Sequence, residues 1–392
     1  MRNSEICLSI RMVKEEAAPG GPGSFERAIE LLDQVRPTRL EWSYIRDREQ
    51  IAQLKARVPV FVAALNTIYP AGHARNFEGE PIVAPWMKTF GHPTGRMHYI
   101  CQNNPEDCQS RMDQAQALIA EGITESFQFD DWYCNAQMVR FGNPCFCEHC
   151  MAAFNDHLGL PFAFNYREYL RRRGITHTAQ LLEMAKSDQV PLWDDYLRFA
   201  DETVERFFRR LRASLDRFAG RPACLSVNGS VLGFGGRSET VAPFIDYFNG
   251  ETPDFSPAAL LKMAEISRQT GVRQVVSFFP DVPASDFHKP EFVGRVNQAI
   301  GLCYCLGLLP LFPYDVYTGS NLPRWYGTWP EYEAAYSVAR ARPEALDLYA
   351  FETVKIEADR VEVVSRHRDD PARCLHHTLC RDGEWNMTEE AA

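Results

Sequence analysis

Residues 124–150 read TESFQFDDWYCNAQMVRFGNPCFCEHC, and this stretch combines a strand pattern, a pair of acids and a group of thiols. Phe127 and Phe129 alternate with polar residues, as expected for a β-strand. The strand pattern runs directly into Asp130 and Asp131. Three closely spaced cysteines follow, and the amphipathic segment MAAFNDHL after them predicts a helix. A strand that delivers acids at its carboxyl end, followed by a loop and a helix, is typical of the active-site face of an α/β barrel.

The same order of strand and then helix recurs along most of the 392 residues. Short apolar runs between turn residues predict strands that are buried on both faces, as in a parallel sheet. Eight such units predict a (β/α)8 TIM barrel, and a doubly wound open sheet is the rival architecture. Besides the strand around Phe127, we expect strands at 6–12, 38–45, 58–66, 223–230, 246–251, 272–280 and 308–316.

The pattern of the sequence changes near its end. From residue 351 the chain reads as a few short strands, too few for a complete sandwich domain. We therefore expect a catalytic barrel domain over 1–350 and a short β-rich C-terminal extension over 351–392.

Composition limits the classes of partner and location. An apolar fraction of 45% allows a large core, and a net charge of −10 without long charged blocks argues against nucleic acid as a partner. The sequence contains no apolar run long enough for a membrane span, and its first residues lack the pattern of a secretory signal. Twelve cysteines in such a chain predict a reducing compartment, with thiols free or bound to metal. We expect a soluble cytoplasmic protein.

The cysteines after the acidic pair have the spacing of metal ligands. Cys145, Cys147 and Cys150 supply three soft ligands, and zinc usually takes four. Cys101 lies upstream in a loop that could reach them, with Cys108 or His149 as replacements. The alternative is a set of reduced thiols at the start of a helix.

An upstream cysteine, a long gap and C-x-C-x-x-C before a helix with Phe154 and Leu158 resembles the zinc site of family 42 glycoside hydrolases, the β-galactosidase-like barrels. The resemblance covers about fifty residues around the cluster. It implies a barrel glycosidase in which zinc is structural and pins a long loop beside the sugar site. It also implies a carbohydrate substrate and no organic cofactor, and it leaves a homo-oligomer open, since that family often forms trimers.

Hydrolysis of a glycosidic bond needs two carboxyl groups, which in a barrel come from the ends of different strands. We expect one of Asp130 and Asp131 to act with Glu251, with Asp281 as the substitute partner. Because successive strand residues point to opposite faces, only one of the adjacent aspartates can point into the pocket. The sequence departs here from family 42, which places a glutamate after an asparagine on strand four and another on strand seven. An acid at a strand end could also be an ordinary helix cap.

Polar and aromatic side chains near other predicted strand ends suit a sugar cleft, because hydroxyl groups need hydrogen bonds and sugar rings pack on aromatic faces. The predicted substrate-binding residues are Arg11, Glu41, Asn66, Trp132, Asn228, Tyr314 and Asp315.

Two other functions remain open at this point. One is a catalytically degenerate barrel that binds carbohydrate, favoured by the missing glutamate on strand seven. The other is a metal-dependent hydrolase that uses His73, His92 and His98, although no HxH or HExxH spacing is present.

Overall fold

The computed structural model shows a closed barrel of eight strands in the order β1-β10-β9-β8-β7-β6-β3-β2. The paired strands within it run parallel, for example β1 with β2 and β8 with β9. The strands are β1 Cys7–Ser9, β2 Arg39–Ser43, β3 Val60–Asn66, β6 Ser126–Asp130, β7 Cys224–Val227, β8 Tyr247–Thr252, β9 Arg273–Phe278 and β10 Leu309–Leu311. Each lies within its predicted segment, except that β8 extends one residue beyond 251, so the (β/α)8 TIM barrel is confirmed. The closure of the sheet excludes the open doubly wound alternative.

The structure describes residues 1–10, 24–66, 68–69, 72–83, 98–130, 132, 135, 138, 142–235, 238–279, 282–311 and 329–391. Arg11, Asp131, Asp281, Tyr314 and Asp315, which the sequence analysis selected, lie outside these residues. His92 lies outside them as well.

Helices follow the strands, and several of them begin at residues whose side chains accept hydrogen bonds from free backbone N–H groups. The Ser24 hydroxyl accepts a bond of 3.2 Å from the N–H of Arg27, and the Asn104 side chain accepts one of 2.8 Å from Glu106. Pro105 stands at the first position of α4, where its missing N–H costs nothing. The helices are α1 Phe25–Val35, α2 Arg48–Lys55, α4 Pro105–Ala120, α6 Glu148–His157, α7 Tyr166–Arg172, α8 Thr178–Lys186, α9 Trp193–Ala219, α10 Ser238–Val241, α11 Pro257–Thr270, α12 Pro290–Cys305, α13 Trp329–Ala341 and α14 Pro343–Leu348.

Short elements complete the secondary structure. The strands β4 Ile68–Tyr69 and β5 His98–Tyr99 pair in an antiparallel ribbon. Single turns of 3-10 helix occur at Val231–Gly233, Ala242–Phe244 and Ala284–Asp286. Among the described helices, none has the length and apolar content that crossing a membrane requires.

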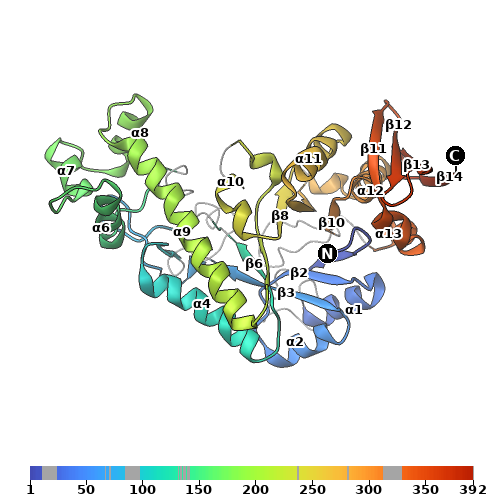
Figure 1. The fold of residues 1–392 in the computed structure, drawn as a ribbon, viewed down its shortest axis with the longest axis horizontal. Helices are drawn as coiled ribbons and strands as arrows, with labels where there is room; N and C mark the ends of the chain where they lie inside the picture. Colours follow the sequence, from blue (N-terminus) through green and yellow to red (C-terminus); the bar gives the residue numbers. More distant parts are fainter. Residues whose placement is uncertain are drawn as a thin grey trace. The chain divides into compact units, whose positions relative to one another are not determined.

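The chain divides into two compact units. Unit 1 comprises Met1–Ala64, Asn228–Phe234 and Asp246–Ala392, and unit 2 comprises Leu65–Val227 and Gly235–Ile245. In unit 2, α4 and α9 lie side by side (Figure 1), and Phe129 of β6 packs on α9. The division at residue 350 that the sequence suggested stays a prediction.

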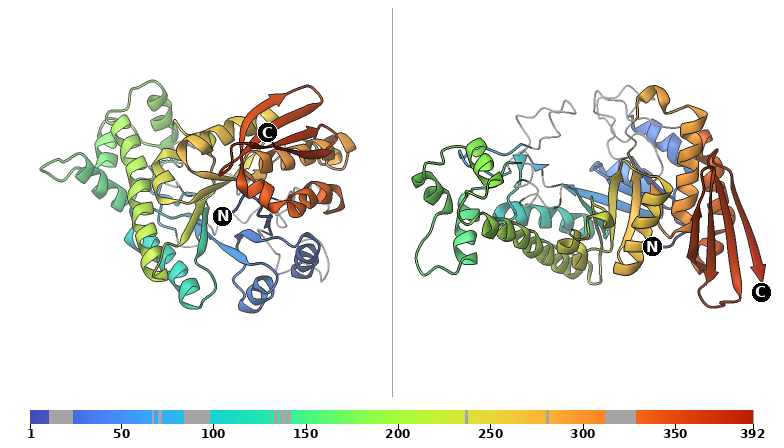
Figure 2. Two further views of the ribbon diagram at one scale, coloured as in Figure 1. Left: turned by 45° about the vertical axis from the view of Figure 1, so that its right-hand side comes forward. Right: turned by 90° about the horizontal axis from the view of Figure 1, so that it is seen from above.

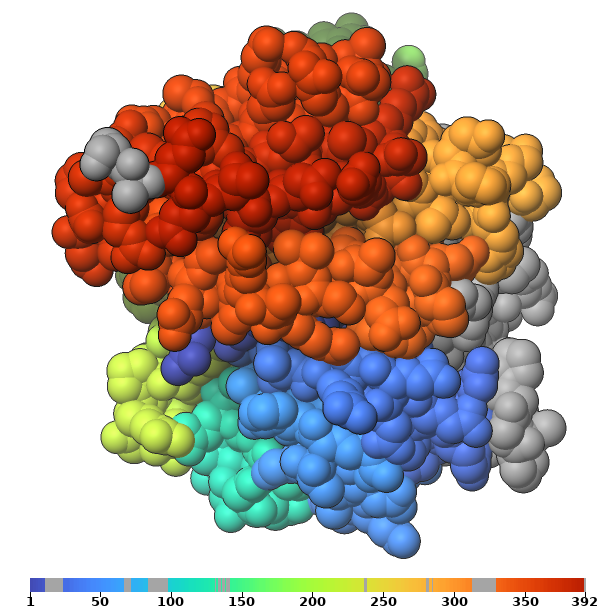
Figure 3. All heavy atoms as spheres, turned by 90° about the vertical axis from the view of Figure 1, so that its right-hand side faces the viewer, coloured from blue at the N-terminus to red at the C-terminus, as the bar shows by residue number. Residues whose placement is uncertain are grey.

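Unit 1 ends in a four-stranded antiparallel sheet, as the sequence pattern of residues 351–392 predicted. Its strands are β11 Tyr349–Ile356, β12 Arg360–His367, β13 Arg373–Cys380 and β14 Trp385–Ala391, paired in chain order. Figure 2 shows the four strands as a separate sheet, and Figure 3 shows them bordering α13. The sheet is thus an appendage to the barrel strands of unit 1 rather than a part of the barrel.

Glycines on α12 allow the sheet to approach the helix closely. A Cβ atom at Gly301 would lie 2.4 Å from Leu379 Cδ2, and one at Gly294 would lie 2.8 Å from the carbonyl oxygen of Arg381. Between them, the Gln298 side chain donates a hydrogen bond of 2.9 Å to the carbonyl of Leu379. The helix and the sheet therefore pack backbone to backbone.

Candidate active site and metal centre

A buried polar network crosses the interior of the barrel strands in unit 1. The Arg39 guanidinium lies 2.8 Å from the Glu41 carboxylate, and the Tyr247 hydroxyl donates to the same carboxylate at 2.8 Å. Asn249 donates to it from its side-chain amide at 3.4 Å. Since β2 and β8 are not neighbours in the barrel order, these contacts must run through its interior.

Glu41 is completely buried at the middle of β2. Burial alone would lower the pKa of the Arg39 guanidinium, but the negative charge of the adjacent Glu41 carboxylate outweighs burial and raises the pKa above its ordinary value. Arg39 therefore stays charged and neutralises Glu41. Glu41 is thus enclosed within the barrel, and its role in substrate binding stays a prediction.

Glu251 lies on the face of β8 that also carries Tyr247 and Asn249. Tyr247 and Asn249 both point to Glu41, and alternate residues of a strand share a face, so Glu251 also belongs to the interior face. It stands near the carboxyl end of β8 and is half-buried, whereas Asn249 is fully buried. Glu251 is therefore the carboxylate that this face of β8 carries next to the carboxyl end of the strand.

The loop that carries Asn228 lies directly on β8. A Cβ atom at Gly250 would stand 2.1 Å from the carbonyl oxygen of Gly229, so only glycine fits beneath this loop. The side chain of Gln274 holds the loop by accepting a hydrogen bond of 3.0 Å from the N–H of Val231. Asn228 is half-buried in this position, next to the segment that ends in Glu251.

Asp130, in unit 2, occupies the corresponding place on β6. The ring of Phe129 packs on α9, with its centroid 5.3 Å from that of Phe207. Helices cover the outer surface of a (β/α)8 barrel, so the Phe129 face is the outer one and Gln128 and Asp130 belong to the inner one. Asp130 is the last residue of the strand and is half-buried.

Trp132 has only 2% of its surface exposed and packs edge-on against Phe208, with centroids 6.1 Å apart. This position suits a hydrophobic anchor for the loop after β6 better than a platform for a sugar ring. Asn66 ends β3 half-buried, and its carbonyl accepts a hydrogen bond of 3.1 Å from Arg111.

Four cysteine thiols converge in unit 2. Cys101, Cys145, Cys147 and Cys150 are all buried, and their sulfur atoms all lie within 4.8 Å of one another. The Sγ atom of Cys101 is 3.4 Å from those of Cys147 and Cys150. A disulfide requires about 2.05 Å, whereas tetrahedral zinc with Zn–S bonds near 2.3 Å places sulfurs about 3.8 Å apart.

The hydrogen bonds around the thiols suit bound thiolates. Side-chain amides of Asn103 and Asn135 each donate to Cys150 Sγ at 3.4 Å, and the backbone N–H of Asn103 donates to Cys101 Sγ. Such donors compensate negative charge on the sulfurs and orient metal ligands. Cys108, the predicted substitute, instead donates its thiol to the carbonyl of Gln102 at 3.2 Å.

Electrostatics favour a cation among these thiols. Burial raises the pKa of the Cys101 thiol well above its usual range, and hydrogen bonds from the neighbouring thiols lower the pKa of Cys147. Several thiolates in a buried space would repel one another unless a positive ion neutralised them. The buried four-cysteine group could therefore hold a metal ion.

The thiol group is linked to the loop after Asp130. Gln102, next to Cys101, donates from its side chain to the carbonyl of Trp132 at 2.8 Å, and its backbone N–H donates to the Asn135 side chain at 2.9 Å. Asn135 in turn donates to Cys150. Any ion that fixes the sulfurs therefore also fixes the segment that follows β6.

The histidines that suggested a catalytic metal do not form such a site in the part of the chain that the structure describes. His73 bonds through Nδ1 to the Asp107 carboxylate at 2.8 Å, and His98 lies in β5. Within those residues the four cysteines are the group that could hold an ion.

Sequence reasoning missed Tyr247, Asn249 and the asparagines around the thiols. Tyr247 and Asn249 alternate in DYFNGE with the predicted Glu251, and this alternation was the available signal for a shared interior face. No comparable signal marks Asn103 and Asn135 as donors to sulfur.

No protein-family model matches the chain, and no curated protein matches it. Solved structures, in contrast, do match the chain. A noncanonic maltogenic α-amylase from Thermotoga neapolitana aligns over 97% of this chain and 86% of its own, with 8% identity and a TM-score of 0.51. A cycloisomaltooligosaccharide glucanotransferase from Paenibacillus sp. aligns over 97% and 74%, with 8% identity and a TM-score of 0.54. At this identity the similarity concerns the fold, and family 42 stays a prediction. The chain shares the TIM-barrel fold of these carbohydrate-active enzymes.

Proposed function

We propose that the chain is a glycoside hydrolase in which Glu251 and Asp130 are the two carboxylates. The observation that carries the proposal is the polar face of β8. Tyr247 and Asn249 are tied to Glu41 within the barrel, so the next residue on that face, Glu251, presents a carboxyl group at the carboxyl end of the strand. Active sites of TIM-barrel enzymes lie at this end.

Asp130 is proposed as the partner because the packing of Phe129 on α9 assigns it to the inner face of β6. One carboxyl group would protonate the leaving oxygen, and the other would act as the nucleophile or activate water. Asn228, held on β8 above Gly250, is suited to bind a sugar hydroxyl. Asp131 and Asp281 remain the alternative carboxylates from the sequence.

We also propose that Cys101, Cys145, Cys147 and Cys150 bind structural zinc. Four thiolates complete a tetrahedral shell and leave no open position, as in structural rather than catalytic sites. The ion would act as a crosslink that holds Trp132 and Asn135 through Gln102. The all-cysteine donor set speaks against the metal-dependent hydrolase. A cytoplasmic location and a homo-oligomer stay predictions.

Hydrolysis of a panel of aryl glycosides and short oligosaccharides tests the function. The panel begins with α-glucosides, because two enzymes with this fold carry the names α-amylase and glucanotransferase. Glu251→Gln and Asp130→Asn should each lower kcat by about 10²–10⁴-fold without unfolding the protein. Glu265→Gln, on the exposed surface of α11, is the matched control and should retain full activity.

Two results would reject parts of the proposal. Full activity in either carboxylate variant would remove that residue from the pair. Binding of an oligosaccharide without turnover of any panel member would favour the degenerate carbohydrate-binding barrel instead.

A further inference from the structure

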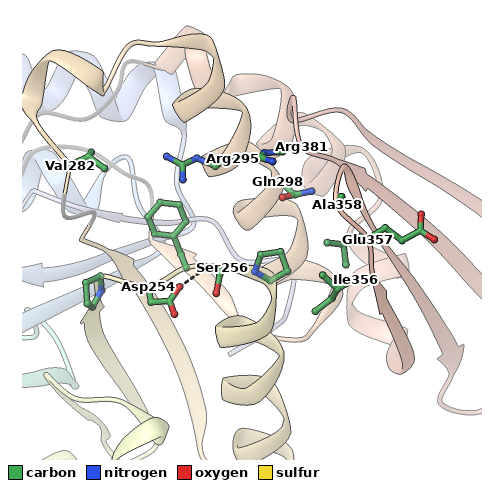
Figure 4. Close-up of a pocket in the computed structure, with 13 residues that line it drawn as sticks. Asp254, Ser256, Val282, Arg295, Gln298, Ile356, Glu357, Ala358 and Arg381 are labelled. Carbon is green, nitrogen blue, oxygen red and sulfur yellow. Dashed lines mark hydrogen bonds between the residues drawn. The ribbon is translucent and has the colours of Figure 1, made fainter.

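A cavity of about 370 Å³ lies within unit 1, at the outer side of the barrel strands (Figure 4). Its walls come from three main parts of the chain, and Val282, in the segment after β9, adds a further contact. The loop at 253–257 joins β8 to α11, α12 forms the second wall, and the turns of the C-terminal sheet form the third. This volume is in the range of small-molecule sites.

Two arginines line the cavity from different elements. Arg295 extends from α12, where its guanidinium lies 5.8 Å from the ring centroid of Phe292, and Arg381 follows β13. Neither guanidinium forms an ion pair with any residue that the structure describes. Glu357, the nearby acid, is already paired with Lys355 at 2.5 Å and with Arg360 at 2.8 Å. Asp254 also lines the cavity, but no ion pair joins it to either arginine among the described residues, so both guanidinium groups remain available to an anionic ligand.

The same cavity contains acceptors for hydroxyl groups. Gln298 is 8% exposed, and its amide nitrogen donates to the carbonyl of Leu379, which leaves its oxygen on the cavity side (Figure 4). Asp254 accepts a hydrogen bond from the N–H of Ser256 through Oδ1, so its other oxygen remains available. Phe255 adds an apolar wall that is braced by Phe278, with ring centroids 5.5 Å apart.

The walls are fixed before any ligand binds. Gly294 and Gly301 hold the C-terminal sheet against α12, and Gly383, at a φ of 97°, places the β13–β14 turn over Asn297. Arg381 donates from its backbone N–H to the carbonyl of Asp359 at 2.8 Å, which ties both turns of the sheet together. The arginines therefore project from a rigid frame, which lowers the entropy lost on binding.

We infer that this cavity binds a small hydroxylated anion, a sugar acid or a sugar phosphate. Guanidinium groups bind carboxylate and phosphate oxygens through paired, charge-assisted hydrogen bonds. Gln298 and Asp254 accept hydrogen bonds from ligand hydroxyls, and the wall at Phe255 packs on the C–H face of the ring. The site is separate from the proposed catalytic pair and does not depend on the glycosidase proposal.

Calorimetric titration of the full chain with glucuronate and with glucose 6-phosphate tests the inference. At least one should bind with a stoichiometry of one, and glucose and inorganic phosphate should bind much more weakly. Arg295→Gln and Arg381→Gln should each weaken binding by about tenfold to a hundredfold. Whichever probe binds more tightly identifies the anionic group.

Control variants test whether the measured binding belongs to this cavity. Arg172→Gln, an exposed change of the same charge on α7, and Glu251→Gln should both leave the affinity unchanged. Thermal melting verifies folding, and the two arginine-to-lysine variants replace any glutamine variant that does not fold. The inference is overturned if neither anionic sugar binds, if the arginine variants bind as well as wild type, or if glucose or inorganic phosphate binds as tightly as the anionic sugars.

Discussion

Replacing Arg39 by methionine removes the positive charge from the interior network of unit 1. The Glu41 carboxylate then remains completely buried without its guanidinium, and only Tyr247 and Asn249 still donate to it. Loss of one partner of a buried ion pair costs about 3–5 kcal/mol of the free energy of unfolding. Glu41→Leu should cost a similar amount, because Arg39 would keep the neutral Tyr247 hydroxyl at 3.2 Å and, as a charged partner, the more distant Glu5 at 3.7 Å.

The double variant should lose far less than the sum of the two single losses. It contains neither charge, so the remaining cost is that of the Tyr247 hydroxyl and the Asn249 amide left without Glu41, about 2–5 kcal/mol together. Independent effects would add to about 6–10 kcal/mol. A coupling of several kcal/mol is therefore the signature of a direct ion pair inside the barrel.

Urea-induced unfolding of the wild type, the two single variants and the double variant measures this coupling, with one shared dependence of the unfolding free energy on urea concentration. Losses that add within about 0.5 kcal/mol would refute the buried ion pair. The same series tests the role of Glu41. If Glu41→Gln folds but raises KM more than tenfold while kcat is kept, Glu41 contacts substrate as the sequence suggested, and the structural interpretation fails.

Three further outcomes are expected. Gly250→Ala places a methyl group against the carbonyl of Gly229, so it should lower the melting temperature and displace the loop after β7, whereas a melting temperature equal to that of wild type would contradict the contact. Cys147→Ser should reduce bound zinc, measured by elemental analysis, and increase proteolysis at the segment after β6; an unchanged zinc content would exclude the four-cysteine site. Burial, reinforced by His376, lowers the pKa of His377 to about 4 from 6.5, so the unfolded chain takes up the proton first. The free energy of unfolding should therefore fall by about 3 kcal/mol as pH drops from 6.5 to 4, and His377→Gln should flatten this dependence; parallel pH profiles for the two proteins would contradict it.

The barrel was predictable because its strands are short apolar runs whose signal is local. The segments at 58–66 and 272–280 each contain one observed strand, and the sequence after residue 351 already read as short strands. The thiol group was also predictable, since Cys145, Cys147 and Cys150 lie close in sequence and a metal needs a fourth ligand. The structure brings Cys101 to them.

The role of Glu41 could not be predicted in the same way. Its partners Tyr247 and Asn249 lie on a strand far along the chain, and only closure of the barrel brings them together. Trp42 has a φ of 60°, and the register between β2 and β3 shifts at this point. Because of this irregularity, simple alternation along β2 does not predict which face of the strand each side chain occupies. Trp132 looked like a sugar platform, because nothing local shows that α9 covers it.

The close contact between α12 and the C-terminal sheet has a consequence for the comparison of related chains. Residues 296–305 of α12 are all buried, so this helix has no solvent-facing side along its second half. A barrel that lacks the sheet would need polar residues at positions such as Gly301, where this chain has small or apolar residues under the sheet. Glycine at 294 and 301 can therefore serve as a marker, in other sequences, for the presence of the extra sheet. By the same reasoning, a chain shortened to end at Leu348 should expose an apolar helix and aggregate.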